Sequence, residues 1–193
     1  MVDTAHNVLV LRNRTKGIPY LGVKRDRSTN HGFVALKGKP AGEARKIAEA
    51  GDVEAVARCL ERLNHADTGF FTVGCEKAFN VDGDVHWAKG YVEFALNSIE
   101  LASDAQQYFK LFFEFNHRLF AKNFNLPVQY GWELEGAMFQ TTDTSGFTAT
   151  VWVTTDVCPM EGEARELWSR ALDELTDFLC ELGPLDPAYA RIY

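Results

Sequence analysis

Histidines with a nearby acidic residue are the first candidates for chemistry in this chain. His65 and Asp67 lie two positions apart, and together with His117 they supply the residue types of a two-histidine, one-carboxylate iron site. Such a site needs the His-x-Asp pair on the rim of a barrel and the second histidine on a facing strand. Here His65 follows a predicted helix end, where it can interact with the last carbonyls, and His117 lies inside another predicted helix. The sequence therefore favours a structural role for these residues.

A second acidic group is formed by Asp82, Asp84 and His86. It is too short, and has too few oxygen ligands, to be a calcium loop. Asp82-Gly83 is instead typical of a tight hairpin turn, because both residues tolerate a positive φ.

The four cysteines, Cys59, Cys75, Cys158 and Cys180, form no Cys-x-x-Cys pair. We expect them to be small buried hydrophobic residues rather than zinc ligands. The chain also has no dinucleotide-binding glycine motif, no phosphate loop and no Gly-x-Ser-x-Gly. The sequence therefore predicts no metal, no cofactor and no catalytic residue.

The elements that would position any site are two similar units of a hairpin and a helix. Gly69–Phe79 and Val85–Leu96 favour β-strands on either side of the Asp82-Gly83 turn, with a bulge expected at Gly90. A capping box, Ser103 to Gln106, then begins a phenylalanine-rich helix that ends near Asn123. The apolar residues extend around this helix, so we expect it to be covered on more than one side, as a core helix. A dimer interface or a lipidic pocket is the functional alternative.

The second unit repeats this order. Pro127–Thr141 and Phe147–Thr155 alternate between apolar and polar residues, as strands with one buried face do. A final helix from Ala164 to Leu182 has apolar residues in helical register and ends at Gly183-Pro184.

The N-terminal segment is less regular and basic. We expect strands at Asn7–Leu11 and at His31–Lys37, and then a helical stretch, Pro40–Leu63, that is interrupted near Gly51 and capped again by Asp52. Residues 1–40 carry eight Lys or Arg against two acidic residues, whereas residues 41–193 carry 12 against 25, which gives the net charge of −7. This basic arm either folds onto the acidic body or reaches an anionic partner.

These patterns predict an α+β fold with a single antiparallel sheet, built from the two hairpin-helix units, and with the helices packed on one face. Residues 1–40 form a basic β-containing arm and residues 41–193 the α+β domain, and 193 residues suit one compact domain overall.

Large aromatic residues stand on the polar side of the predicted strands. Trp87, Tyr91 and Trp152 share this face with Glu133 and Glu135. Exposed aromatic residues are the anchors that protein interfaces use, so these five residues are the predicted binding site. The alternative is that the basic arm covers the face and neutralises its glutamates.

The composition also limits the partners. No apolar run approaches the roughly 20 residues that span a bilayer, and the N-terminus lacks the features of a secretion signal. The basic arm has few aromatic residues and the chain as a whole is acidic, which argues against nucleic acid. We therefore expect a cytoplasmic protein with no membrane or nucleic-acid partner.

Residues 50–182 resemble the YbjN-type domain and its structural relatives, the class I type III secretion chaperones. The similarity lies in Phe115-Asn-His-Arg118 late in the middle helix, Pro127-Val-Gln-Tyr130 at the start of the next strand, Thr154-Thr-Asp156 and the final helix. The resemblance implies a small acidic cytosolic protein, often dimeric, that binds another protein without catalytic residues. It supplies no binding residue, and the arm at 1–40 has no counterpart in it.

Together these observations predict a non-catalytic protein-binding module, chaperone-like or adaptor-like, that engages a basic or unfolded segment of a partner and can form a homodimer. A toxin-neutralising immunity protein has the same size and acidity. The alternative is a small-ligand or metal-dependent enzyme whose pocket is lined by the phenylalanine-rich helix.

Overall fold

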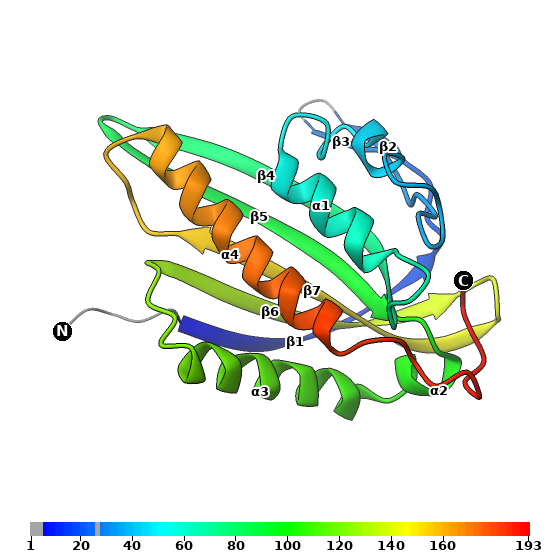
Figure 1. The fold of residues 1–193 in the computed structure, drawn as a ribbon. Coiled ribbons are helices and arrows are strands. Elements are labelled where there is room, and N and C mark those ends of the chain that lie inside the picture. The colour runs from blue at the N-terminus through cyan, green and yellow to red at the C-terminus, as the bar shows by residue number, and fades with distance from the viewer. Residues whose placement is uncertain (1–5, 26–27) are drawn as a thin grey trace.

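The computed structural model of the chain describes residues 6–25 and 28–193. Its helices cover one face of a long, curved sheet (Figure 1). The elements are, in order, β1 (His6–Ile18), β2 (Val23–Arg25), β3 (Ser28–Asn30), the 3₁₀ turn η1 (Ala44–Lys46), α1 (Glu54–Leu63), β4 (Phe70–Asp82), β5 (Val85–Leu96), α2 (Ile99–Ala102), α3 (Ala105–Ala121), β6 (Val128–Phe139), β7 (Thr144–Thr155) and α4 (Glu161–Glu181).

The main sheet has five strands in the order β1-β6-β7-β5-β4, while β2 and β3 form a separate small hairpin. The pairs β4–β5, β5–β7 and β6–β7 are antiparallel, but β1 runs parallel to β6. The α+β class with a single main sheet is therefore confirmed, and the prediction of a purely antiparallel sheet is wrong. A parallel pair needs a long connection, and the whole chain between Ile18 and Val128 provides it.

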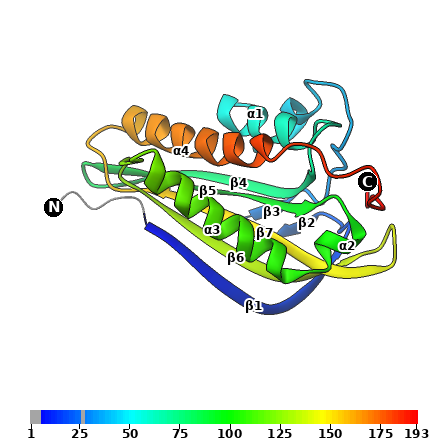
Figure 2. The same ribbon diagram turned by 60° about the horizontal axis from the view of Figure 1, so that its bottom comes forward.

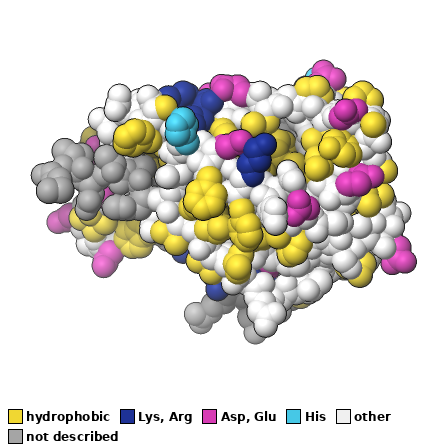
Figure 3. Space-filling view, turned by 90° about the horizontal axis from the view of Figure 1, so that it is seen from below, with side chains coloured by type: hydrophobic (Ala, Val, Ile, Leu, Met, Phe, Trp, Pro, Cys, Tyr) yellow, Lys and Arg dark blue, Asp and Glu magenta, His cyan; other side chains and the backbone are white. Residues whose placement is uncertain are grey.

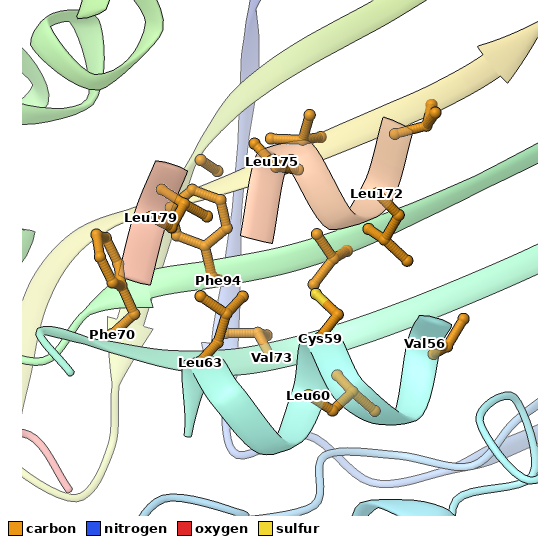
Figure 4. Packing of buried hydrophobic residues seen from close by; sticks show 14 of the residues in the cluster. Val56, Cys59, Leu60, Leu63, Phe70, Val73, Phe94, Leu172, Leu175 and Leu179 are labelled. Atoms are coloured by element: carbon orange, nitrogen blue, oxygen red, sulfur yellow. The ribbon is translucent and has the colours of Figure 1, made fainter. Parts of the chain in front are cut away.

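The helices pack on the face of the sheet that carries the apolar residues of β5, β6 and β7 (Figure 2). Two hydrogen bonds fix α4 there, one from Trp168 Nε1 to the Val153 carbonyl at 3.0 Å and one from Tyr130 Oη to the Ala171 carbonyl at 2.9 Å. In the close view of Figure 4, the labelled leucines of α4 and Cys59 and Leu63 of α1 point toward one another, and Phe94 of β5 lies between them. This layer of buried side chains is the hydrophobic core.

The middle helix α3 lies at one side of this layer rather than at its centre. Its inner face is buried through Tyr108 and Phe115, and Phe115 packs against the ring of Tyr130 with 4.9 Å between ring centroids. Its outer face leaves Phe113 64% and Phe120 83% exposed. The expectation that this helix is covered on more than one side is therefore wrong, because α3 has the sheet and α4 on its inner side only. Its N-cap is Asp104, which accepts from the Gln106 N–H at 2.9 Å, and not Ser103.

The N-terminal segment differs most from the expectation. β1 continues to Ile18 through a bulge between Arg12 and Thr15 and belongs to the main sheet. Residues 31–37 form no strand, since the chain turns at Gly32 (φ +85°) and again at Gly38 (φ +69°). Most of the predicted helical stretch 40–63 is irregular, and α1 begins only at Glu54, with Val53 and not Asp52 as its N-cap.

Gly90 has a packing role and marks no bulge, because the β4–β5 ladder is regular there and bulges near Val73 instead. A Cβ at Gly90 would lie 2.6 Å from Trp168 Cζ2 and 2.4 Å from the Glu76 carbonyl oxygen. Glycine therefore allows α4 to sit close to β5.

Within the described residues, no helix combines the length and the apolar composition that crossing a bilayer requires.

Candidate binding face of the sheet

The sheet face opposite the helices, here called the open face, carries the five residues predicted to bind. Strand pairing sets Tyr91 beside Trp152, and sets Glu93 beside Thr150, which in turn pairs with Glu133. Side chains alternate along a strand, so Trp87 and Lys89 share this face with Tyr91, and Glu135 shares it with Glu133. The prediction that these side chains lie on one face is therefore confirmed by the register, while their role in binding is not tested by it.

Tyr91 and Trp152 form the centre of the open face. Their ring centroids lie 4.6 Å apart at an interplanar angle of 58°, and both side chains are half-buried. The Lys89 ammonium lies 4.8 Å from the centroid of the Trp152 ring, a cation–π contact. Trp87, also half-buried, extends the aromatic surface along β5. Aromatic rings held rigidly by their neighbours lose little entropy on binding, which suits them to anchor a partner.

Three glutamates of this face, Glu93, Glu133 and Glu135, form ion pairs with the chain's own β1. Arg12 forms an ion pair with Glu133, Arg14 with Glu135, and Lys16 with both Glu93 and Glu135. The side chains of Glu135 and Glu93 are only 3% and 5% exposed. The basic segment therefore neutralises these carboxylates, as the alternative interpretation of the arm proposed. Glu135 lies in an internal ion-pair cluster and presents no free carboxylate to a partner.

The electrostatics of this cluster follow from its geometry. Burial of Glu135 opposes ionisation, but hydrogen bonds from Lys16 and Arg14 and their positive charges outweigh it, so the pKa of Glu135 lies below its ordinary value. Burial, and then the negative charges of Glu93 and Glu76, raise the pKa of Tyr91. Tyr91 is therefore neutral at physiological pH, and its hydroxyl remains available as a donor.

The residues considered for an iron site are not brought together. His65 and Asp67 are exposed beyond the end of α1, with 3.5 Å between Nδ1 and Oδ2, and His65 lines a cavity there. His117 lines a different cavity, of about 620 Å³, beside Phe113 and Phe120 on the outer face of α3. Throughout residues 6–25 and 28–193, no three His, Cys, Asp or Glu side chains are grouped so that they could hold a metal ion.

The group at 82–86 forms the β4–β5 turn, as expected from its sequence. Gly83 has φ +58°, and His86 exchanges two backbone hydrogen bonds with Cys158, at 2.8 and 2.7 Å.

All four cysteines are free thiols. Burial raises the pKa of Cys59 and of Cys75 to about 12, so both thiols are protonated and unreactive at neutral pH.

Two residues near this face were missed in the sequence. The spacing of Lys89 gives no sign of its contact, because only the β5–β7 register places it over Trp152. Tyr20, in the irregular basic segment, donates from its hydroxyl to the Val73 carbonyl at 3.1 Å and so reaches β4. No pattern in the sequence signals that long-range contact.

Comparison of the chain with protein-family models, with curated proteins and with solved structures finds no match.

Proposed function

We propose that this chain is a non-catalytic protein-binding module, chaperone-like or adaptor-like, whose partner docks on the open face. The observation that carries the proposal is the Tyr91–Trp152 ring pair, half-buried on the side of the sheet away from the helices, with Lys89 over the Trp152 ring. Interfaces concentrate their binding energy in a few aromatic and cationic anchors of this kind.

The internal ion pairs support this use of the face. Since β1 neutralises Glu93, Glu133 and Glu135, a partner that covers the aromatic rings does not have to desolvate three unpaired carboxylates. The partner's segment therefore contacts the rings of Trp87, Tyr91 and Trp152. Of the three glutamates paired with β1, Glu133 is the most exposed, at 18% of its side chain.

The same proposal includes a similarity to YbjN-type domains and type III secretion chaperones, with their division into two hairpin-helix units. It also includes a cytoplasmic location. The antiparallel pairing of β4 with β5 before α3, and of β6 with β7 before α4, is compatible with it.

A homodimer is also part of the proposal. Figure 3 looks onto the side that carries α3 and β1, where hydrophobic side chains gather. Phe113 and Phe120, both exposed, are seven residues apart and so lie on one stripe of α3. Two copies of such a stripe can pack antiparallel, each phenylalanine against one of the other copy. Light scattering on Phe113→Ser/Phe120→Ser tests this: the wild type is expected to be dimeric and the variant monomeric, and a monomeric wild type would refute the dimer.

Affinity capture from the native cell extract tests the binding function. Wild type is compared with Trp87→Ala/Trp152→Ala and with the milder Lys89→Glu, and Val81→Ala at the exposed hairpin tip is the matched control. Losing an aromatic anchor costs about 2 kcal/mol or more at a true interface. We expect a stoichiometric partner with wild type and Val81→Ala that is lost with the folded open-face variants. Equal capture by all four proteins would reject the open face as the docking surface.

A further inference from the structure

A cavity of about 450 Å³ lies against the edge of β4, and the functions considered so far make no use of it. One side is formed by the edge strand itself, residues 72–77. The other side is formed by the irregular chain that Figure 1 shows leading from β2 and β3 toward α1, including His31 and Glu49. Tyr20 and Tyr91 also line it. This β4-edge cavity is within the size range of sites for small molecules, about 300–1,000 Å³.

Gly74 lies where three polar groups converge. A Cβ at this position would be 3.1 Å from Tyr20 Oη, 3.7 Å from Glu93 Oε2 and 3.8 Å from Tyr91 Oη. The absence of a side chain therefore leaves room beside the two hydroxyls and the carboxylate. Tyr20 is held in place by its hydrogen bond to Val73 and by edge-to-face packing on Phe33, with 6.5 Å between the ring centroids.

The described lining of this space carries more carboxylates than ammonium groups. Glu49 and Glu76 line the cavity, while Glu93, behind Gly74, is already paired with Lys16. Of the basic residues in the lining, His31 is bound through Nδ1 to Glu49 at 2.7 Å and Lys77 is paired with Asp52. Glu76 has no ion-pair partner within the part of the chain that the structure describes. The pKa of Tyr20 is raised to about 12, mostly by burial and then by the negative charge of Glu93.

We propose that the β4-edge cavity binds the ammonium or guanidinium group of an organic cation. The hydroxyl oxygens of Tyr20 and Tyr91 can accept hydrogen bonds from the cation, and Glu49 and Glu76 offer charge-assisted ones. Anions are repelled by the same carboxylates. The cation is supplied either by a free amine or by a lysine or arginine side chain of a protein, and the chemistry that recognises it is the same. The site does not depend on the proposed docking at the open face, although Tyr91 borders both.

Calorimetric titration with agmatine, which carries both cationic groups, tests the site. Saturable binding is expected for agmatine and none for the neutral 1,5-pentanediol or the anionic glutarate. Glu49→Gln and Glu76→Gln should each weaken binding by about tenfold or more, since each removes a charged acceptor. The matched control Glu114→Gln, on the distant helix α3, should bind as wild type does. Gly74→Ala, whose Cβ enters the space between the hydroxyls, should weaken binding without removing a charge.

The proposal is overturned if agmatine produces no saturable heat at millimolar concentration, if pentanediol binds equally well, or if both lining variants bind like wild type. A second titration with a capped Gly-Arg-Gly peptide separates the two sources. Tighter binding of the peptide than of agmatine points to a protein side chain, and the reverse points to a free amine. Trp87→Ala, outside the lining, should bind agmatine normally. If agmatine does not bind but the open face still captures a partner, the cavity site is rejected and the proposed docking function is retained.

Discussion

Lys16 Nζ on β1 lies 2.6 Å from Glu135 Oε1 on β6, and the same ammonium also pairs with Glu93 on β5. One cation therefore connects the parallel edge strand to two strands of the antiparallel part of the sheet. The Glu135 side chain is only 3% exposed and that of Lys16 is 29% exposed, so the contact holds a buried carboxylate against a partly buried ammonium.

Removal of this cation is expected to destabilise the fold. In Lys16→Met, Glu135 keeps Arg14 as a partner, but Glu93 loses its ion pair while remaining buried, and leaving a buried charge uncompensated costs about 3 kcal/mol. Urea denaturation at pH 7 measures the change. The matched control is Lys110→Met, whose ammonium is 69% exposed and 3.7 Å from Glu114, and which should change the free energy of unfolding by less than about 0.5 kcal/mol. Equal stabilities of the two variants would contradict a buried role for Lys16.

The same cluster predicts a dependence of stability on acid. The pKa of Glu135 is lower in the folded protein than its ordinary value of 4.5. A carboxyl group of this kind contributes stability that is fully present above its unfolded pKa and is lost as pH falls through the folded pKa. Glu135→Gln should therefore flatten the fall in unfolding free energy below about pH 4.5. A fall as steep in the variant as in wild type would show that other carboxylates account for it.

The parts of the fold that the sequence predicts are those with a local periodicity. Strict alternation placed Tyr91 and Trp152 on the polar side of their strands, and the helical spacing of apolar residues identified α4. The parallel position of β1 has no local signal, because Arg12, Arg14 and Lys16 pair with Glu133 and Glu135 of β6, more than a hundred positions away.

The candidate sites show the same limit. Glu135 was expected to face a partner because its neighbours in sequence alternate in polarity, yet β1 buries it. Phe113 and Phe120 were expected inside because apolar residues extend around their helix, yet no other element covers them in the described chain. The β4-edge cavity depends on Tyr20 reaching Val73 across the fold, which no spacing indicates.

The close approach of α4 to β5 predicts opposite effects for two glycine substitutions. Gly90→Ala places a Cβ against Trp168 and the Glu76 carbonyl, and such overpacking costs about 1–3 kcal/mol or more. Gly162→Ala lies in the first turn of α4, where nothing is within 4 Å of a Cβ, so it should stabilise the protein by up to about 1 kcal/mol. Thermal unfolding of the two variants measures both effects. A neutral Gly90→Ala would contradict the close approach of Trp168 and the Glu76 carbonyl to this position.

Lys37 is expected to titrate well below an ordinary lysine. Its ammonium donates to the His65 carbonyl, the Thr68 carbonyl and Thr68 Oγ1 at 2.6, 2.7 and 2.9 Å. Burial, and then the positive charge of Arg191, lower its pKa from 10.5 to about 8. NMR titration of the lysine side chains should find one lysine with a midpoint near 8, and its signal should disappear in Lys37→Met. The control variant Lys39→Met, with an exposed lysine two positions away, should retain that signal.

The sign of the effect on stability follows from this shift. Between pH 8 and 10.5 the folded protein holds fewer protons at Lys37 than the unfolded chain does. The free energy of unfolding contributed by this residue therefore rises with pH across that window and is constant below it. The difference in unfolding free energy between wild type and Lys37→Met, measured by urea denaturation from pH 7 to pH 10.5, should shift in favour of wild type as pH increases. A difference that stays constant, or that shifts toward the variant, would mean that the three carbonyl and hydroxyl acceptors hold the ammonium in its charged form despite burial.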